Sequence, residues 1–304
     1  MASTLINRFR GQVALQCMVL PWIVWLAIFS YVPMYGILIA FQEYRLGRGF
    51  LDGPWVGFGH FLVFFNNPDF LPILRNTVAI SLLKLLVGFP APILFALLLN
   101  ELRRKSFKKT VQTISYLPYF ISWVVISGMI YRLLSSEGSI INEALLRVGI
   151  VSKPVFFLGQ SRFFWPILVL SDVWKMVGFN SIIFLAAISG IDQTLYEAAL
   201  ADGAGRLRRA FSITLPCLAP TVVILLIFNM SGILSSNFDQ IYLLSNPLVM
   251  DVAEVIDTYV FKMGIGQARF SFSTAVGLFK SVIGFLLIVS ANAVTRRVSE
   301  YSIW

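Results

Sequence analysis

The most regular feature of the chain is a series of long apolar stretches separated by polar connections. A helix needs about 20 apolar residues to cross a bilayer. Six stretches reach that length, at residues 13–41, 74–99, 111–132, 163–189, 217–238 and 271–294. The first run is too long for a cleaved signal peptide, and no small-x-small cleavage site follows it. The pattern therefore predicts an all-α integral membrane protein with six transmembrane helices.

Composition supports the same class of protein. Hydrophobic residues make up 58% of the chain and charged residues only 13%, with a mean hydropathy of +0.80. These values lie far from those of a soluble domain. We divide the chain into residues 1–73, an anchor helix with the first outer loop, and residues 74–304, a five-helix core that contains a polar loop at 190–216.

The distribution of basic residues predicts the orientation. Twelve Lys and Arg fall in four connections and only seven in the other three, although these three are longer together. Connections that face the cytoplasm carry the excess of basic residues. The connections rich in Lys and Arg are 1–12, 100–110, 190–216 and 295–304, so both termini are predicted to be cytoplasmic. The same asymmetry explains much of the net charge of +9, and nucleic acid is not expected as a partner.

Several kinds of chemistry are missing from the sequence. His60 is the only histidine, so neither a Ser/His/Asp triad nor a zinc site of Cys and His can be assembled. Cys17 and Cys217 lie far apart at membrane segments and are interpreted as small hydrophobic residues. No phosphate-binding loop of the GxxxxGK[ST] type occurs. We expect no catalytic residue, no metal and no cofactor in this chain.

The polar loop at 190–216 has an ordered pattern of its own. Thr194 and Glu197 have the spacing of a capping box, which predicts a short helix that Gly203 ends. Leu195, Ala198 and Ala199 share one face of that helix, where two small side chains let another backbone come close. A second short helix follows, and Arg206 lies in its basic start. The alternative is an ordinary amphipathic loop.

This loop resembles the signature of the transmembrane subunits of binding-protein-dependent ABC importers. That signature is Glu-Ala-Ala, three residues, Gly, nine residues and Ile-x-Leu-Pro, and the chain matches it from Glu197 to Pro216. Further segments resemble the carbohydrate-uptake branch, and within it permeases for complex polysaccharides and oligosaccharides of the maltose-transporter first-permease type: Leu20–Pro21, Tyr31–Tyr35, Phe89–Pro92, Thr113–Pro118, Trp174–Lys175 and Glu300–Trp304. The resemblance covers nearly all of the chain.

The resemblance implies a type I permease core in the bacterial cytoplasmic membrane, working by alternating access. Its implied partners are a second homologous permease, two ATPase subunits that bind ATP and Mg, and an extracytoplasmic solute-binding protein that brings an oligosaccharide. The loop 190–216 is then the coupling loop that contacts the ATPases. The residues expected to carry that contact are Leu195, Glu197, Ala198, Ala199, Gly203 and Arg206.

Polar residues inside the spans are costly and mark candidate solute paths. On the fifth span, Asn229, Gly232, Ser236 and Asp239 form one stripe if the span is a continuous helix. Lys280 lies on a similar stripe of the sixth span. Lys84, Lys175 and the aromatic Trp174 complete the predicted path. Stripes of small residues can also serve helix packing alone.

The charges in the spans leave alternatives open. Asp172 and Lys175 are three residues apart and can pair with each other. Lys84 and Lys280 would then pair with an anionic solute such as a uronic-acid oligosaccharide, pair with acidic residues of the second permease, or snorkel to an interface. Two rival functions also remain, which are a secondary transporter driven by an ion gradient and a membrane scaffold or sensor that transports nothing.

Overall fold

The computed structural model describes residues 12–298 except 46, 48, 51 and 236. Over these residues the regular structure is helical, with one isolated β-bridge between Gln42 and Trp55. The all-α prediction is therefore confirmed. The chain divides into two compact units, Met1–Asn66 with Lys262–Leu278, and Asn67–Phe261 with Phe279–Trp304.

Among the described residues, four unbroken helical segments are long and apolar enough to cross a membrane. Two further candidates are pairs of helices joined at a sharp bend, of 101° in the first pair and 61° in the second. Counting each bent pair as one span gives the predicted six. The unbroken segments are Leu15–Phe41, Phe70–Asn100, Ser161–Ser189 and Phe270–Ser290, and the bent pairs are Lys105–Phe120 with Trp123–Leu134 and Arg206–Cys217 with Ala219–Met230.

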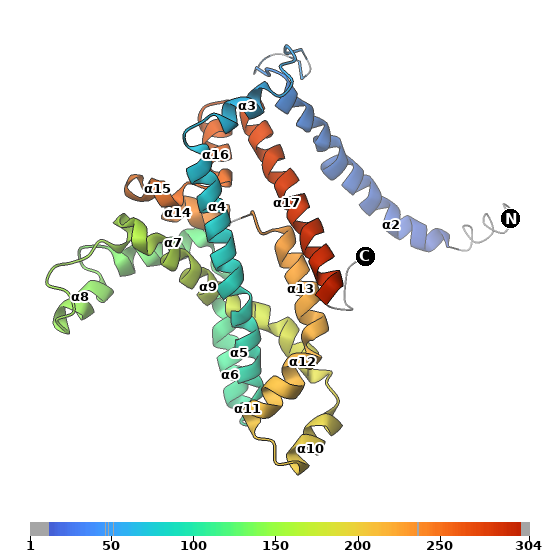
Figure 1. Cartoon of the computed structure of the whole chain (residues 1–304), viewed down its shortest axis with the longest axis vertical. Coiled ribbons are helices and arrows are strands. Elements are labelled where there is room, and N and C mark those ends of the chain that lie inside the picture. The colour runs from blue at the N-terminus through green and yellow to red at the C-terminus, as the bar shows by residue number, and fades with distance from the viewer. Residues whose placement is uncertain (1–11, 46, 48, 51, 236, 299–304) are drawn as a thin grey trace. The chain divides into compact units, whose positions relative to one another are not determined.

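The larger unit is organised around the fourth span, α9 (Ser161–Ser189). This helix packs against α5 (Pro90–Asn100), α6 (Lys105–Tyr116) and the π-helix η3 (Lys84–Gly88), as Figure 1 shows. Together with α4 (Phe70–Leu83), η3 and α5 form the unbroken second span. The helix α9 therefore has neighbours along most of its length.

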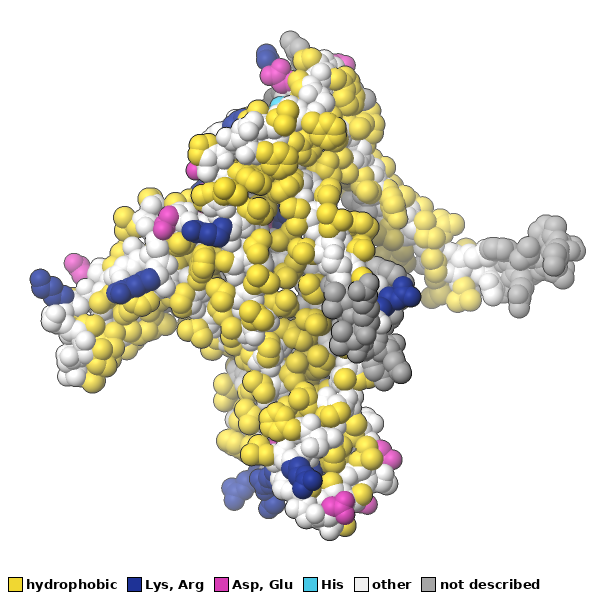
Figure 2. Space-filling view, in the orientation of Figure 1, with side chains coloured by type: hydrophobic (Ala, Val, Ile, Leu, Met, Phe, Trp, Pro, Cys, Tyr) yellow, Lys and Arg dark blue, Asp and Glu magenta, His cyan; other side chains and the backbone are white. Residues whose placement is uncertain are grey.

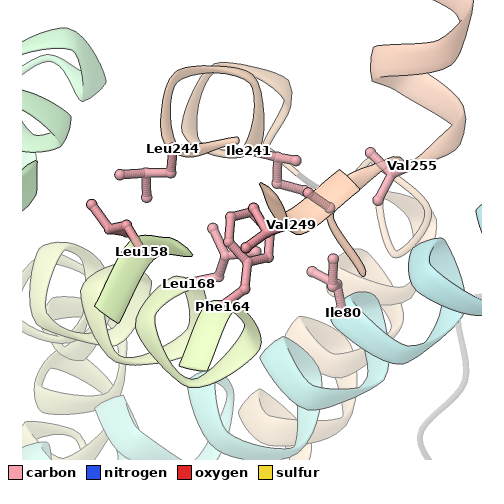
Figure 3. Packing of buried hydrophobic residues seen from close by; sticks show 9 residues of the cluster. Ile80, Leu158, Phe164, Leu168, Ile241, Leu244, Val249 and Val255 are labelled. Carbon is pink, nitrogen blue, oxygen red and sulfur yellow. The ribbon is translucent and has the colours of Figure 1, made fainter. Parts of the chain in front are cut away.

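Buried apolar side chains hold these elements in place. Figure 3 shows the main cluster, in which Ile80 of α4 meets Phe164 and Leu168 of α9. Leu158 comes from the turn before α9, and the remaining members come from the segments around α14 (Phe238–Leu244), α15 (Met250–Ala253) and α16 (Ile256–Phe261). The whole set is Ile80, Leu158, Phe164, Leu168, Ile241, Leu244, Val249, Ala253 and Val255. Burial of one such side chain contributes about 1.5–3 kcal/mol, so this cluster fixes α14 against α9.

The third span is broken, and its prediction as one helix over 111–132 is wrong. After α6 and a 3₁₀ turn, η4 (Leu117–Phe120), the backbone of Ile121 is extended, and α7 (Trp123–Leu134) starts in a direction 101° away. Ser122 caps the new helix by accepting a hydrogen bond from the Val125 amide at 3.4 Å. The apolar pattern does not show this break, because apolar residues continue on both sides of it, at Tyr119, Phe120, Trp123 and Val124.

The fifth span is also broken, at two places. A 61° bend at Leu218 separates α11 (Arg206–Arg209), η6 (Ala210–Thr214) and α12 (Leu215–Cys217) from α13 (Ala219–Ser231). The helix α13 then ends at Ser231, and α14 begins only after a left-handed Asn237 with φ of 53°. The predicted helix over 217–238 is therefore wrong at its outer end.

The remaining elements of the larger unit are short. The helix α8 (Ile140–Arg147) lies between Gly138 and Gly149, and Ser139 caps it by accepting from the Asn142 amide at 3.0 Å. The 3₁₀ turns η5 (Phe157–Gly159) and η7 (Pro247–Val249) connect longer elements.

The smaller unit contains the first span, which runs through α2 (Val13–Leu26), the π-helix η1 (Ala27–Tyr31) and the 3₁₀ helix η2 (Val32–Phe41). It also contains α3 (Gly59–Phe65), the π-helix η8 (Lys262–Gly266) and the first turns of α17 (Phe270–Val298). The Tyr44 amide donates to Ser271 Oγ at 2.9 Å. This bond ties the loop after the first span to the start of α17.

Candidate coupling loop and solute pocket

The loop 190–216 contains the two short helices that the sequence predicts. The first, α10 (Gln193–Ala201), is capped by Asp192, whose carboxylate accepts a hydrogen bond from the Thr194 amide at 2.9 Å. This hydrogen bond lowers the pKa of the Asp192 carboxyl. The predicted capping box starting at Thr194 is therefore wrong by two residues, because the aspartate upstream takes the cap position.

Gly203 ends α10 as predicted. Its φ is +75°, a left-handed conformation that glycine adopts without steric cost. The Gly203 amide donates to the Leu200 carbonyl at 3.0 Å, and the Ala204 amide donates to the Ala199 carbonyl at 2.8 Å. These two bonds are a Schellman motif, so the end of the helix has a defined geometry.

The two short helices expose apolar side chains. Leu195 and Leu200 of α10 are 46% and 55% exposed, and Leu207 of α11 is 76% exposed. Glu197 and Ala198 are exposed and Ala199 is half-buried. Figure 2 shows charged side chains gathered around this end of the larger unit.

Two contacts connect the loop to the spans. Arg206 Nε lies 3.9 Å from Glu101 Oε2, just beyond the end of α5. The Tyr196 hydroxyl lies 2.8 Å from Thr214 Oγ1, so α10 is bonded to η6 at the start of the fifth span. Between these contacts lies a cleft of about 420 Å³, lined by residues that include Glu101, Glu197, Arg206 and Arg209.

A polar pocket of about 200 Å³ lies beside the break between α13 and α14. Non-helical backbone at membrane depth is tolerated where it lines such a cavity or is buried in protein. The pocket is lined by residues from η3, α9, α13 and the break, among them Lys84, Asp172, Met176, Asn180, Asn229, Gly232, Ser235 and Asn237.

Lys84 pairs with Asp172, which corrects the pairing of Asp172 with Lys175 considered above. Lys84 Nζ lies 3.7 Å from Asp172 Oδ1 and donates to Gln240 Oε1 at 2.5 Å. Asp172 also accepts from Asn237 Nδ2 at 2.8 Å. Because Lys84 comes from η3, Asp172 from α9 and the amides from the segment around α14, this network joins three elements at the pocket.

Lys175 has a different environment. It is 6% exposed, and its ammonium donates to the carbonyls of Pro118, Tyr119 and Ile121. These carbonyls lie at the break of the third span, where the regular helical hydrogen bonding ends, and the Pro118 carbonyl also accepts from the Ile121 amide at 3.2 Å. Lys175 does not line the polar pocket, and its contacts favour a structural role.

Of the other residues predicted to line the solute path, some line the polar pocket and others lie elsewhere. Asn229 lines the pocket, whereas Lys280 pairs with Asp257 of α16 and lies 3.4 Å from Ser235 Oγ. Asp239 is exposed on α14. Trp174 lines an apolar groove between α7 and α9 instead. Ser236 lies outside the described residues, and the single stripe proposed for the fifth span does not exist because α13 ends first.

Sequence reasoning missed four polar residues of the pocket network, Asp172 as a lining residue, Asn180, Asn237 and Gln240. One signal was available, since Asp172, Met176 and Asn180 recur every four residues and therefore share a face of α9. No comparable signal marks Asn237 or Gln240, because their place depends on the break before α14.

The geometry defines a class of protein, a multi-pass helical membrane protein with a broken span beside a polar pocket and a separate loop that exposes apolar side chains. The chain belongs to the family of binding-protein-dependent transport system inner membrane components, whose model matches residues 88–300. It is 43% identical over 300 residues to the polygalacturonan/rhamnogalacturonan transport system permease protein YteP of Bacillus subtilis (strain 168), covering 99% of this chain and 93% of that protein.

Two solved structures have the same fold over nearly the whole chain. One is a bacterial alginate ABC transporter in complex with an alginate pentasaccharide-bound periplasmic protein, with a TM-score of 0.90 and 39% identity, covering 98% of this chain and 99% of that chain. The other is a bacterial ABC transporter involved in the import of the acidic polysaccharide alginate, with a TM-score of 0.90 and 40% identity, covering 97% of this chain and 99% of that chain.

Proposed function

We propose that this chain is the permease subunit of an ATP-driven importer for oligosaccharides or polysaccharides, with both termini in the cytoplasm. The observation that carries the proposal is the coupling loop 190–216. Its first helix, α10, has a defined cap at each end, and the loop exposes large apolar side chains, Leu195, Leu200, Leu207 and Phe211. A contiguous exposed apolar surface of this kind is typical of protein docking sites.

The docking partners are two ATPase subunits, which bind ATP and Mg and perform the hydrolysis. A displacement of α10 reaches the spans through the contact of Arg206 with Glu101 and the bond of Tyr196 with Thr214. Glu101 follows α5, which continues from η3, and Thr214 leads into α13. Both routes end at walls of the polar pocket, so closure of the ATPases would reshape it.

The pocket is one wall of the solute path, and a second homologous permease supplies the other. An extracytoplasmic solute-binding protein delivers the sugar from the outer side. Amide side chains of Asn180 and Asn229 line the pocket, and amides both donate to and accept from sugar hydroxyls. The polygalacturonan and alginate systems to which the chain is similar support a polysaccharide-derived substrate.

The family match weighs against the two rival functions. An ion-gradient-driven transporter needs no docking loop for an ATPase, and a scaffold needs no polar pocket beside a broken span. Both features are present together in the larger unit.

The test is purification of the assembled complex and measurement of ATPase stimulation and uptake over a panel of oligosaccharides. Gly203→Val should weaken ATPase copurification and uptake, because a β-branched residue at φ of +75° is strained by about 1–2 kcal/mol. Glu197→Ala should act in the same direction by removing an exposed acidic contact.

A matched control lies two residues further along the same loop. Gly205 has φ of −67°, and a Cβ there would meet nothing within 4 Å. Gly205→Ala should therefore leave copurification and uptake intact. Full uptake by Gly203→Val and Glu197→Ala would contradict the proposed coupling role, and uptake by this chain without any ATPase would favour the secondary transporter.

A further inference from the structure

The three deep lysines of the larger unit differ in what surrounds them. The ammonium of Lys175 is enclosed by backbone carbonyls, and Lys280 pairs with Asp257 outside the lining of the polar pocket. Lys84 alone of these three lysines lines the pocket, and its partner Asp172 lines it too. Their side chains are 12% and 14% exposed.

The ion pair of Lys84 and Asp172 is long. Lys84 Nζ lies 3.7 Å from Asp172 Oδ1, whereas a close charge-assisted hydrogen bond spans about 2.7–2.9 Å. A charge pair in a low-dielectric site is only well compensated when its geometry is close and its hydrogen bonds are complete. The pair is therefore open to exchange with another charged group that enters the pocket.

Each charge is also held by an amide that does not depend on the pair. Gln240 accepts from Lys84 and is itself fixed, because its Nε2 donates to the Leu168 carbonyl at 2.8 Å and to Ser171 Oγ at 2.9 Å. Gln240 is fully buried. Asn237 holds Asp172 in the same way. The ammonium would thus keep its position when its counter-ion changes.

We propose that Lys84 is the counter-ion for a carboxylate of the transported sugar, so that a uronate unit replaces Asp172 as its partner in the pocket. This rests on the proposed function as an oligosaccharide importer. In the empty pocket Asp172 keeps Lys84 compensated. In the occupied pocket Asp172 repels the uronate, which keeps binding weak enough for the sugar to move on, as a transport path requires.

The experiment uses the complete complex in proteoliposomes, with trigalacturonate and its fully methyl-esterified form as probes. The ester has the same length and no charge. The half-saturating concentration and the maximal rate of uptake are measured for both sugars. Each variant is compared with the wild type, so that any preference of the binding protein for one of the two sugars cancels.

Lys84→Gln should raise the half-saturating concentration for trigalacturonate about tenfold, the effect of losing a charge-assisted bond. For the ester it should change less than about twofold. Lys84→Arg should keep the preference for the acid. Lys280→Gln, at a lysine that pairs with Asp257 and does not itself line the pocket, should change uptake of both sugars by the same factor.

Asp172→Asn is an independent test, which can be used even if the Lys84→Gln complex fails to assemble. This variant should lower both the half-saturating concentration and the maximal rate of trigalacturonate uptake. Neither value should change for the ester. If Lys84→Gln and Asp172→Asn each changed the half-saturating concentrations of both sugars by the same factor, the proposed role of Lys84 would be wrong, and the proposed importer function would be unaffected. Absence of uptake of any oligosaccharide by the wild-type complex would overturn the proposed function as well.

Discussion

The third and fifth spans of the larger unit are both broken, and the two breaks differ in what surrounds the backbone groups that they free. Each break frees backbone groups that a continuous helix would satisfy, and such groups are costly at membrane depth. At the third-span break, between η4 and α7, the freed carbonyls accept from the ammonium of Lys175, which is 6% exposed. At the fifth-span break, between α13 and α14, the backbone lines a polar pocket instead.

This difference distinguishes two roles that a buried lysine can have. A lysine whose donors are consumed by backbone carbonyls stabilises a bend, and it is not available to a solute. A lysine that lines a pocket beside an acidic side chain can exchange its partner. By this criterion the third-span break is structural and the fifth-span break is functional, and the predictions below test that division.

The largest effect is expected for Lys175→Met, which keeps the length of the side chain and removes its ammonium. The Pro118 carbonyl would keep the Ile121 amide as a donor, whereas the carbonyls of Tyr119 and Ile121 would lose Lys175. Because a buried carbonyl left without a donor costs about 1–3 kcal/mol, the larger unit should lose at least about 2 kcal/mol of stability. Thermal unfolding of the purified complex should show a clearly lower midpoint. An unchanged midpoint would mean that the third-span break does not depend on Lys175.

A smaller effect is expected where α9 passes α6 near the same break. A Cβ on Gly178 would lie 2.0 Å from the Ser115 carbonyl oxygen, so Gly178→Ala should force the two helices apart. Overpacking of this kind costs about 1–3 kcal/mol.

Gly128 in α7 is the matched control for Gly178, since a Cβ there would meet nothing within 4 Å. Gly128→Ala should be neutral or stabilising by up to about 1 kcal/mol, because alanine favours the helix. Both variants are compared by thermal unfolding of the complex. The same midpoint for the two alanine variants would show that α9 and α6 do not pack as closely as described.

The smallest effect on stability is expected at the fifth-span break. Asn237→Gly retains a residue that accepts φ of 53° and removes only the amide that donates to Asp172, which should cost about 1 kcal/mol. Uptake of sugar should fall more than this loss of stability explains. A loss of stability as large as that of Lys175→Met would erase the distinction between the breaks.

The sequence predicts the features that depend on local spacing. The six apolar stretches, the end of α10 at Gly203 and the short helix α8 all follow from residues that are near one another in the chain. The cap of α10 was misplaced by two residues because Thr194 and Asp192 are both good caps.

The breaks and the charge pairs could not be predicted in this way. Apolar residues lie on both sides of Ile121 and of Gly232, so the apolar pattern alone does not show where a helix stops. The partner of Asp172 is 88 positions away in sequence at Lys84 rather than three away at Lys175. Only the packing of η3 against α9 decides that choice.

The most direct test of the account compares the two breaks for access by a water-soluble thiol reagent. Gly232→Cys places a thiol in the open space of the pocket, and Ile121→Cys places one at the third-span break, each in a chain with Cys17 and Cys217 replaced by serine. A methanethiosulfonate anion is added to the assembled complex with and without transported sugar. The account predicts that Gly232→Cys is labelled quickly and that sugar slows its labelling, while labelling of Ile121→Cys does not respond to sugar. Equal protection of both positions, or no protection of Gly232→Cys, would contradict it.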